Sequence, residues 1–170
     1  MVYLSPGFDF KGYETLIISG LPISSNIPKT DIDPDEMNIY FIKQLIKNMN
    51  NTGLFTKVTD DTAAISDLNK QTGKTLILES SLSELEPGNR ALRYFVGFGA
   101  GAAKAQVEID IREAETKKTL YKSSDRRVGF MGGFGGDSKD FLINFLNLIA
   151  EGQASFIKRI SAGGKIEKAQ

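Results

Sequence analysis

The chain has 170 residues, and its 21 basic and 21 acidic side chains give a formal net charge of zero. No overall field therefore draws the molecule to nucleic acid or to an anionic membrane, and we expect no nucleic-acid partner. The sequence contains no His and no Cys. This excludes a histidine general base, a histidine or thiolate metal ligand, a cysteine nucleophile and a disulfide.

The length and a hydrophobic fraction of 41% predict one globular domain over residues 1–170, with an ordered core from about 13 to 160. No apolar run reaches the roughly 20 residues that a membrane-spanning helix needs. The opening residues, from Met1 to Gly7, lack a basic segment followed by an apolar one. We therefore expect either a cytosolic protein or one whose export segment lies upstream of Met1.

The start of the chain is predicted to contain one strand between two irregular segments. Residues 1–11 are expected to be an irregular lead-in, because Pro6 and Gly7 break regular structure. The short apolar run over residues 13–19 predicts a buried strand. Residues 20–32 contain two Pro and two Ser, which predicts a loop.

A capping motif predicts the start of the first long helix. Asp33 can cap the helix, Pro34 fits its first position, and Glu36 stands three residues after the cap, as in a capping box. The helix is expected to end near Gly53. An apolar residue recurs at every fourth position, which is typical of an amphipathic helix: Met37, Phe41, Leu45 and Met49.

The middle of the chain is predicted to form two strands and a short helix. Residues 54–59 predict a short strand, and residues 63–71 predict a short helix. The next strand has leucines on one face and polar residues on the other: Leu76, Leu78 and Leu82 point one way, and Glu79, Ser81 and Ser83 the other.

The second half of the chain is predicted to form a hairpin and a long final helix. Residues 104–113 alternate between apolar and polar side chains, which indicates a strand with one buried and one wet face. A turn over 114–118 and a strand over 119–128 complete the hairpin. A glycine-rich loop, 129–136, then precedes a helix capped by Asp137 or Ser138, and the polar tail 161–170 is expected to fray. The predicted buried stripe of this helix is Phe141, Phe145, Leu148, Ile149, Phe156 and Ile160.

The order of these elements predicts an α+β domain of two layers. The clean alternation at 104–113 indicates a mostly antiparallel sheet with one open face. The two long amphipathic helices are expected to pack together on the other face.

Residues 97–104 are the first candidate for a binding segment, because glycine lets backbone N–H groups approach an anion. A phosphate loop also needs Lys followed by Ser or Thr at the start of a helix, whereas Lys104 is followed by Ala and Gln and opens a strand. We weigh nucleotide binding, a flexible or bulged hairpin connection, and an apolar contact site for another subunit or a lipid surface. The hairpin connection is favoured.

The second glycine-rich segment, 129–136, carries Phe130, Met131 and Phe134 before a helix N-terminus. Its backbone could bind an anion, but we favour a loop whose aromatic side chains pack on the sheet.

Two pairs of arginines are the third candidate. Arg90 and Arg93 precede the first glycine-rich segment, and Arg126 and Arg127 precede the second, so the four would form a basic patch if the segments are neighbours. A solvated edge with Glu84 nearby is the favoured alternative. We predict no catalytic residues, no cofactor and no metal site. The candidate binding surface consists of Arg90, Arg93, Tyr94, Phe95, Gly97, Gly99, Gly101, Arg126, Arg127, Phe130 and Phe134.

The run GNRALRYFVGFGAG at residues 88–101, the hairpin after it and the run VGFMGG at 128–133 together resemble the bacterial domain-of-unknown-function family 4410. The likeness extends from about Tyr13 to Arg159, and its glycine–arginine segment is the most specific part. One departure is the hairpin turn at 115–118, where a Gly is expected. The resemblance implies an exported envelope lipoprotein, with an export signal and a lipidated Cys upstream, and it implies no catalytic residues.

We therefore expect a periplasmic, lipid-anchored protein that acts as a binding or assembly module on a protein or envelope component. Two alternatives stay open. One is an anion- or nucleotide-binding domain that uses Arg90, Arg93 and the glycine-rich segments. The other is an oligomer subunit whose interface is formed by residues 94–103 and 129–136.

Overall fold

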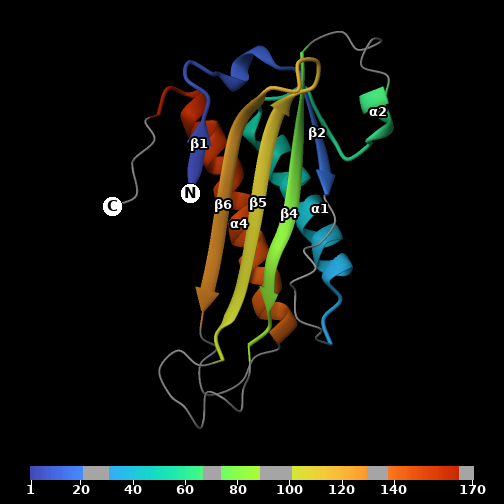
Figure 1. The fold of residues 1–170 in the computed structure, drawn as a ribbon, viewed down its shortest axis with the longest axis vertical. Coiled ribbons are helices and arrows are strands. Elements are labelled where there is room, and N and C mark those ends of the chain that lie inside the picture. The colour runs from blue at the N-terminus through green and yellow to red at the C-terminus, as the bar shows by residue number, and fades with distance from the viewer. Residues whose placement is uncertain (21–30, 67–73, 89–100, 130–137, 165–170) are drawn as a thin grey trace.

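The computed structural model describes residues 1–20, 31–66, 74–88, 101–129 and 138–164. Over these residues the chain forms a six-stranded sheet with the strand order β1-β6-β5-β4-β2-β3. The two long helices, α1 (Pro34–Thr52) and α4 (Ser138–Ser161), pack against each other on one face of this sheet (Figure 1). The predicted two-layer α+β architecture is confirmed. The strands are β1 (Val2–Leu4), β2 (Thr15–Gly20), β3 (Lys57–Thr59), β4 (Thr75–Glu86), β5 (Ala103–Glu113) and β6 (Thr119–Gly129).

The sheet is mixed, with an antiparallel half and a smaller parallel half. The pairs β4–β5, β5–β6 and β6–β1 are antiparallel. β2 runs parallel to β3 on one side and to β4 on the other. Parallel neighbours need a crossover connection, and α1 supplies it between β2 and β3. The long strands thus all belong to the antiparallel half.

The predicted start of α1 is confirmed in its main features. The Asp33 carboxylate accepts a hydrogen bond from the backbone N–H of Asp35 at 3.0 Å, and Pro34 occupies the first turn. Gly53 ends the helix with a φ of 70°, in the left-handed region that favours glycine. Glu36 does not complete a capping box, because its carboxylate binds Lys139 of α4 at 2.9 Å.

Two local predictions need correction. The lead-in is partly regular, because β1 pairs with β6 and a short 3₁₀ helix spans Phe10–Gly12. A strand of three residues is too short for its alternation to be visible in the sequence. The strand expected over 54–59 is confined to Lys57–Thr59. The helix expected over 63–71 is present as α2 in its described part, Ala63–Ser66.

The buried face of α4 is displaced from the predicted stripe. Leu148 is 44% exposed, and Phe141, Phe156 and Ile160 are only half-buried. The displacement follows from packing, because α4 is covered by the sheet on one side and by α1 on another. The buried face consists of Leu142, Phe145, Leu146, Ile149, Ala150, Gln153, Ala154, Ile157 and Ser161.

Several predictions fall on residues that are not described. These are most of the loop 20–32, the second half of the helix at 63–71, the first half of the segment 97–104, all but the first residue of the segment 129–136, the Asp137 cap and the end of the tail.

The core lies between the helix layer and the sheet. Leu45 of α1, Leu146 of α4 and Leu78 of β4 are fully buried in it. The sequence predicted the burial of Leu45 and Leu78. Among the described residues, no helix combines the length and apolar character needed to cross a membrane.

Candidate interaction surface

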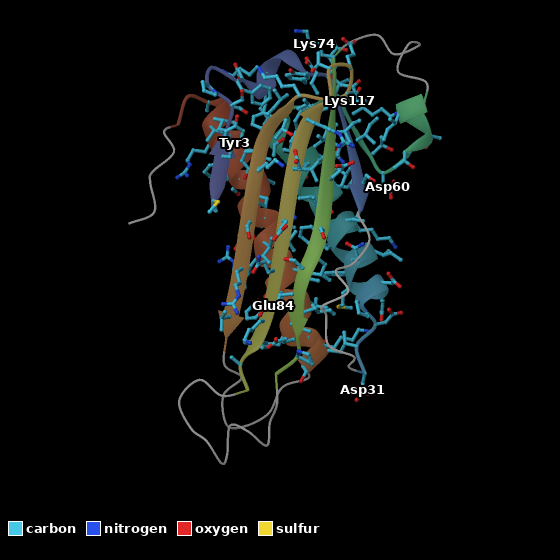
Figure 2. The ribbon with its side chains drawn as sticks, in the orientation of Figure 1. Tyr3, Asp31, Asp60, Lys74, Glu84 and Lys117 are labelled. Atoms are coloured by element: carbon cyan, nitrogen blue, oxygen red, sulfur yellow. The ribbon has the colours of Figure 1, made fainter. Side chains whose placement is uncertain are left out.

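The open face of the sheet is formed by the outward residues of β4, β5 and β6. The predicted alternation in β5 is confirmed: Val107 and Ile109 are buried under the helices, whereas Glu108 is exposed on the open face. Figure 2 shows Glu84 on this same face, which points away from the helices. In the described part of the chain, a site on the open face is therefore built mainly from strand residues.

Charged side chains on the open face are joined in ion pairs across the strands. Lys104 Nζ lies 2.6 Å from Glu86 Oε2, and Lys122 Nζ lies 2.7 Å from Asp110 Oδ2. Arg112 pairs with a glutamate of β4, Glu79. Such partly exposed pairs contribute little to stability, but they leave few charges free to act on a ligand.

Arg126 and Arg127 lie on opposite faces of β6, because successive residues of a strand point to opposite sides. Arg126 is on the open face, where its Nε and Nη2 donate to the two oxygens of Glu84 at 2.6 and 3.1 Å. Arg127 is on the helix face, where its Nη2 lies 2.9 Å from Asp125 Oδ2. The two arginines therefore do not form one patch, and the favoured interpretation with Glu84 nearby is confirmed for Arg126.

The Arg126–Glu84 pair shifts the pKa of both groups. The hydrogen bond from Arg126 holds the pKa of the Glu84 carboxyl below its ordinary value, against the opposing effect of burial. The pKa of Arg126 is raised by the same hydrogen bond. A carboxylate held ionised in this way is a poor general acid.

Gly101 is the other candidate residue in the described part of the chain. It has a φ of 77°, and it lies so close to Gly88 that a Cβ on Gly88 would come 2.5 Å from the Gly101 carbonyl oxygen. These glycines stand near the ends of β4 and β5, which pair in antiparallel orientation. Lys104 lies at the start of a strand and not of a helix, as predicted, whereas the segment between the two glycines lies outside the described residues. The remaining candidates lie outside the described residues: Arg90, Arg93, Tyr94, Phe95, Gly97, Gly99, Phe130 and Phe134.

A shallow pocket of about 400 Å³ lies on the open face beside β1. Its lining includes Tyr3, Glu79, Glu108, Asp110 and Lys122. Two of these carboxylates already pair with a cation, Glu79 with Arg112 and Asp110 with Lys122. Within the described ranges, no group of acidic residues is arranged to hold a metal ion.

A buried polar contact joins β6 to α4. Gln153 Oε1 accepts hydrogen bonds from the Tyr121 hydroxyl at 2.8 Å and from Ser123 Oγ at 2.9 Å. Burial is the main reason that the pKa of Tyr121 is raised to about 12. These three polar groups satisfy one another inside the fold, so we assign them a structural role.

A second polar cluster stands at the opposite end of the sheet from Gly88. The Tyr13 hydroxyl donates to Glu113 at 3.1 Å, and Thr116 Oγ1 donates to the same carboxylate at 2.6 Å. Burial and the Glu113 hydrogen bond raise the pKa of Tyr13 to about 12. Lys74 lies over the Tyr13 ring at 5.9 Å from its centroid. The cluster ties the start of β2 to the β5–β6 turn.

The outer edge of β6 is only half covered. β1 lies beside the upper part of β6 in Figure 1 and pairs with residues 121–123. The pairing ends where Met1 and Ser124 exchange two backbone hydrogen bonds, at 3.1 and 2.9 Å. We call the remainder, Asp125–Gly129, the free edge of β6, since no other described strand pairs with its outer side.

The free edge could not be found from the sequence. The residues of β6 have the pattern of a strand, but a strand's position in the sheet depends on which segments pair with it. The glycine and aromatic residues of the sequence instead favoured a site in the segments 97–104 and 129–136, on either side of the β5–β6 hairpin.

A family model described as "Domain of unknown function (DUF4410)" matches residues 31–133 of the chain, from the start of α1 to just beyond β6. No curated protein sequence matches the chain.

The fold is similar to that of two solved structures. One is the PelC dodecamer from Paraburkholderia phytofirmans, with a TM-score of 0.56, 10% identity and coverage of 89% of this chain and 93% of that one. The other is protein XCC0632 from Xanthomonas campestris, of the family DUF330, with a TM-score of 0.59, 7% identity and coverage of 94% and 91%. At these identities the likeness shows the fold alone.

Proposed function

We propose that this chain, which belongs to the DUF4410 family, acts as a binding or assembly module of the bacterial cell envelope and not as an enzyme. The resemblance to exported lipoproteins supports a periplasmic, lipid-anchored location. The partner is a protein or another component of the envelope.

One observation carries the proposal: the charged side chains that the structure describes on the open face are largely engaged in pairs with one another, as Arg126 is with Glu84. Val2 and Val128 are 40% and 46% exposed on the neighbouring strands β1 and β6, on opposite faces of the sheet, so apolar side chains are also available for contact. The chemistry available here is therefore contact, not proton transfer or nucleophilic attack.

Membrane fractionation of the full-length gene product tests the location. The native gene is expressed with its own upstream sequence, and lipidation is followed by incorporation of radiolabelled palmitate. We expect the label in the protein and the protein in the membrane fraction. A native start at Met1 with unlabelled, soluble cytosolic protein would contradict an envelope lipoprotein.

An oligomer subunit is the second candidate function. It is supported by the fold shared with PelC, a protein whose structure is that of a dodecamer. Mass measurement by light scattering over a wide range of protein concentrations tests it. A monomer mass at every concentration would contradict this candidate and would leave the binding module standing.

A further inference from the structure

We propose that one end of the molecule binds an anionic lipid surface. This end, which we call the cationic end, is formed by the 3₁₀ helix Phe10–Gly12, the starts of β3 and β4, the β5–β6 turn and the last turn of α4. The inference rests on the proposed function, for which it names the surface that faces the membrane. The basic side chains of the cationic end are Lys11, Lys57, Lys74, Lys117, Lys118, Lys158 and Arg159.

Backbone hydrogen bonds of Glu14 bring two of these lysines together. The Glu14 carbonyl accepts a hydrogen bond from the N–H of Lys57 at 3.1 Å. The Glu14 N–H donates to the carbonyl of Lys74 at 2.9 Å. Figure 2 shows Lys74 at the same end of the molecule as Lys117. The starts of β3 and β4 therefore each place a lysine at this end.

The β5–β6 turn adds two lysines beside them. Glu113 forms backbone hydrogen bonds with Lys117 and Lys118, which closes the turn. The Tyr13 hydroxyl donates to the Glu113 carboxylate at 3.1 Å, and Lys74 lies over the Tyr13 ring at 5.9 Å from its centroid. Tyr13 thus joins the lysines of the turn to the lysine that precedes β4.

The 3₁₀ helix and the last turn of α4 complete the cationic end. The rings of Phe10 and Phe156 both contact Tyr121, with centroids 6.2 and 6.0 Å from its own. Arg159 lies over the Phe156 ring at 5.3 Å. Lys11 follows Phe10 directly in the chain. One aromatic group therefore positions basic side chains from both segments.

The cations of this end are unpaired, in contrast to those of the open face. All of them are exposed, and none forms an ion pair with another described residue. The described carboxylates of the same segments are fewer, and the Asp9 carboxylate already caps the 3₁₀ helix. These carboxylates are Asp9, Glu14, Glu113 and Glu115. The excess positive charge is therefore available to attract an anionic surface.

The opposite end of the molecule is acidic. Both long helices start there (Figure 1), and Figure 2 shows Asp31 far from Lys74. Acidic side chains suit the positive end of a helix dipole. The carboxylates at and just before the first turn of α1 are Asp31, Asp33, Asp35 and Glu36. A molecule with a net charge of zero is thus attracted to an anionic surface by one end and repelled by the other.

The composition of the cationic end favours lipid headgroups over a protein partner. Protein interfaces are enriched in arginine and depleted in lysine. The cationic end has lysine at every basic position except Arg159. A single acyl chain binds a membrane weakly and reversibly, and a basic surface supplies a second signal for stable attachment. Exposed lysines next to a lipid anchor suit this role.

An N-terminal tether is able to reach the cationic end. Met1 bonds to Ser124, which lies six residues beyond Lys118 of the turn. Even a tether that first continued β1 to the end of β6 would return to this end with about twenty extended residues, at roughly 3.3 Å per residue. The lipid anchor and the cationic end are therefore able to contact one membrane.

Vesicle binding by the 170-residue chain tests the surface. The probes are vesicles of phosphatidylcholine and vesicles that also contain anionic phosphatidylglycerol, and co-sedimentation measures binding. We expect at least about tenfold stronger binding to the anionic vesicles at low ionic strength. This difference should vanish at about 1 M salt, where the Debye length falls to about 3 Å.

Two double variants separate the cationic end from a general effect of charge. Lys117→Gln with Lys118→Gln removes two charges from the turn. Lys43→Gln with Lys47→Gln is the matched control, since it removes two exposed lysines of α1 that form no ion pair with a described residue. We expect the first variant to weaken binding to anionic vesicles at least about tenfold and the control to change it less than about twofold. Unfolding midpoints establish that both variants fold.

Fluorescent labels test the orientation. The chain has no Cys, so Glu115→Cys and Asp31→Cys each provide one labelling site, and each removes one exposed carboxylate. Brominated lipids in the anionic vesicles quench a label that lies close to the bilayer. We expect quenching at residue 115 and none at residue 31.

The assignment is wrong if binding does not depend on anionic lipid, if the two double variants bind equally, or if both labels are quenched alike. Binding to polyglutamate without binding to vesicles would identify an acidic protein as the partner instead. If the full-length protein still fractionates with the membrane in these cases, the envelope module stands and the cationic-end assignment alone fails.

Discussion

The side-chain oxygen of Gln153 accepts a hydrogen bond from the buried Tyr121 hydroxyl at 2.8 Å, which joins α4 to the first part of β6. Ser123 donates to the same oxygen. We predict that Gln153→Leu lowers the free energy of unfolding by about 2–4 kcal/mol, because two buried donors lose their acceptor. Urea denaturation measures the change.

A triple variant serves as the control for this contact. Replacing Tyr121 by Phe and Ser123 by Ala in the Gln153→Leu background removes both donors together with the acceptor. The triple variant should be less destabilised than the sum of the single changes, because no unsatisfied group remains. An additive result would contradict the assigned network.

Alkaline pH should destabilise the fold through Tyr121. Its pKa is about 12 in the folded state against an ordinary value of 10, so the folded state holds this proton more tightly. The resulting stability is fully present below pH 10 and is lost as the pH rises from 10 to 12. Tyr121→Phe should therefore reduce the fall in unfolding midpoint over this window without abolishing it, because the pKa of Tyr13 is also raised to about 12.

The Arg126–Glu84 pair should be visible in the titration of Glu84. Its pKa is lowered chiefly by the hydrogen bond from Arg126, so Arg126→Ala should raise it toward the ordinary value. Arg127→Ala is the matched control, because Arg127 lies on the opposite face of the same strand. NMR titration of side-chain carboxyl carbons measures both. A shift of equal size in the two variants would contradict the placement of the arginines.

Replacing Gly88 should disturb the end of the β4–β5 hairpin. Gly88→Ala introduces a Cβ 2.5 Å from the Gly101 carbonyl oxygen at a residue with a φ of 79°. The backbone must shift, so we expect a loss of at least about 2 kcal/mol. Gly12→Ala places its Cβ in open space and should change stability by less than about 0.5 kcal/mol. Thermal unfolding of the two variants provides the comparison.

Two leucine variants test the faces of the long helices. Leu45→Ala removes a fully buried side chain from the core and should cost about 2–5 kcal/mol. Leu148→Ala truncates an exposed side chain and should cost less than about 0.5 kcal/mol. A large cost at Leu148, measured by urea denaturation, would restore the stripe that the sequence predicted.

The sequence predicted the elements whose signals are local and long. The alternation of Val107 and Glu108 extends over the whole of β5, and α1 begins with a cap at Asp33 and a proline after it. Both elements are confirmed. The three-residue strand at Val2–Leu4 carries too few positions for a period to appear. Leu148 was misplaced because contacts with the sheet and with α1 together set which arc of α4 is buried, and Leu148 lies outside that arc.

The candidate surface was predicted less well for a related reason. Glycine and aromatic composition drew attention to the segments beside the hairpin, and Arg126 and Arg127 were grouped because they are neighbours in sequence. In a strand, two residues that are adjacent in sequence have their side chains on opposite faces of the sheet. The contact of Arg126 with Glu84, 42 residues away, follows instead from the β4–β5–β6 register.

The sequence by itself determined that this protein has two amphipathic helices and long alternating strands, that it has no histidine or cysteine chemistry, and that its family likeness is to DUF4410. Only the tertiary structure decided the strand order, and with it which segments far apart in the chain lie side by side. The physical reason is the distance in sequence between the residues that interact. Helix and strand periods are set by interactions between near neighbours in sequence. The pairing of Met1 with Ser124, by contrast, brings together residues from opposite parts of the chain once the whole core has formed.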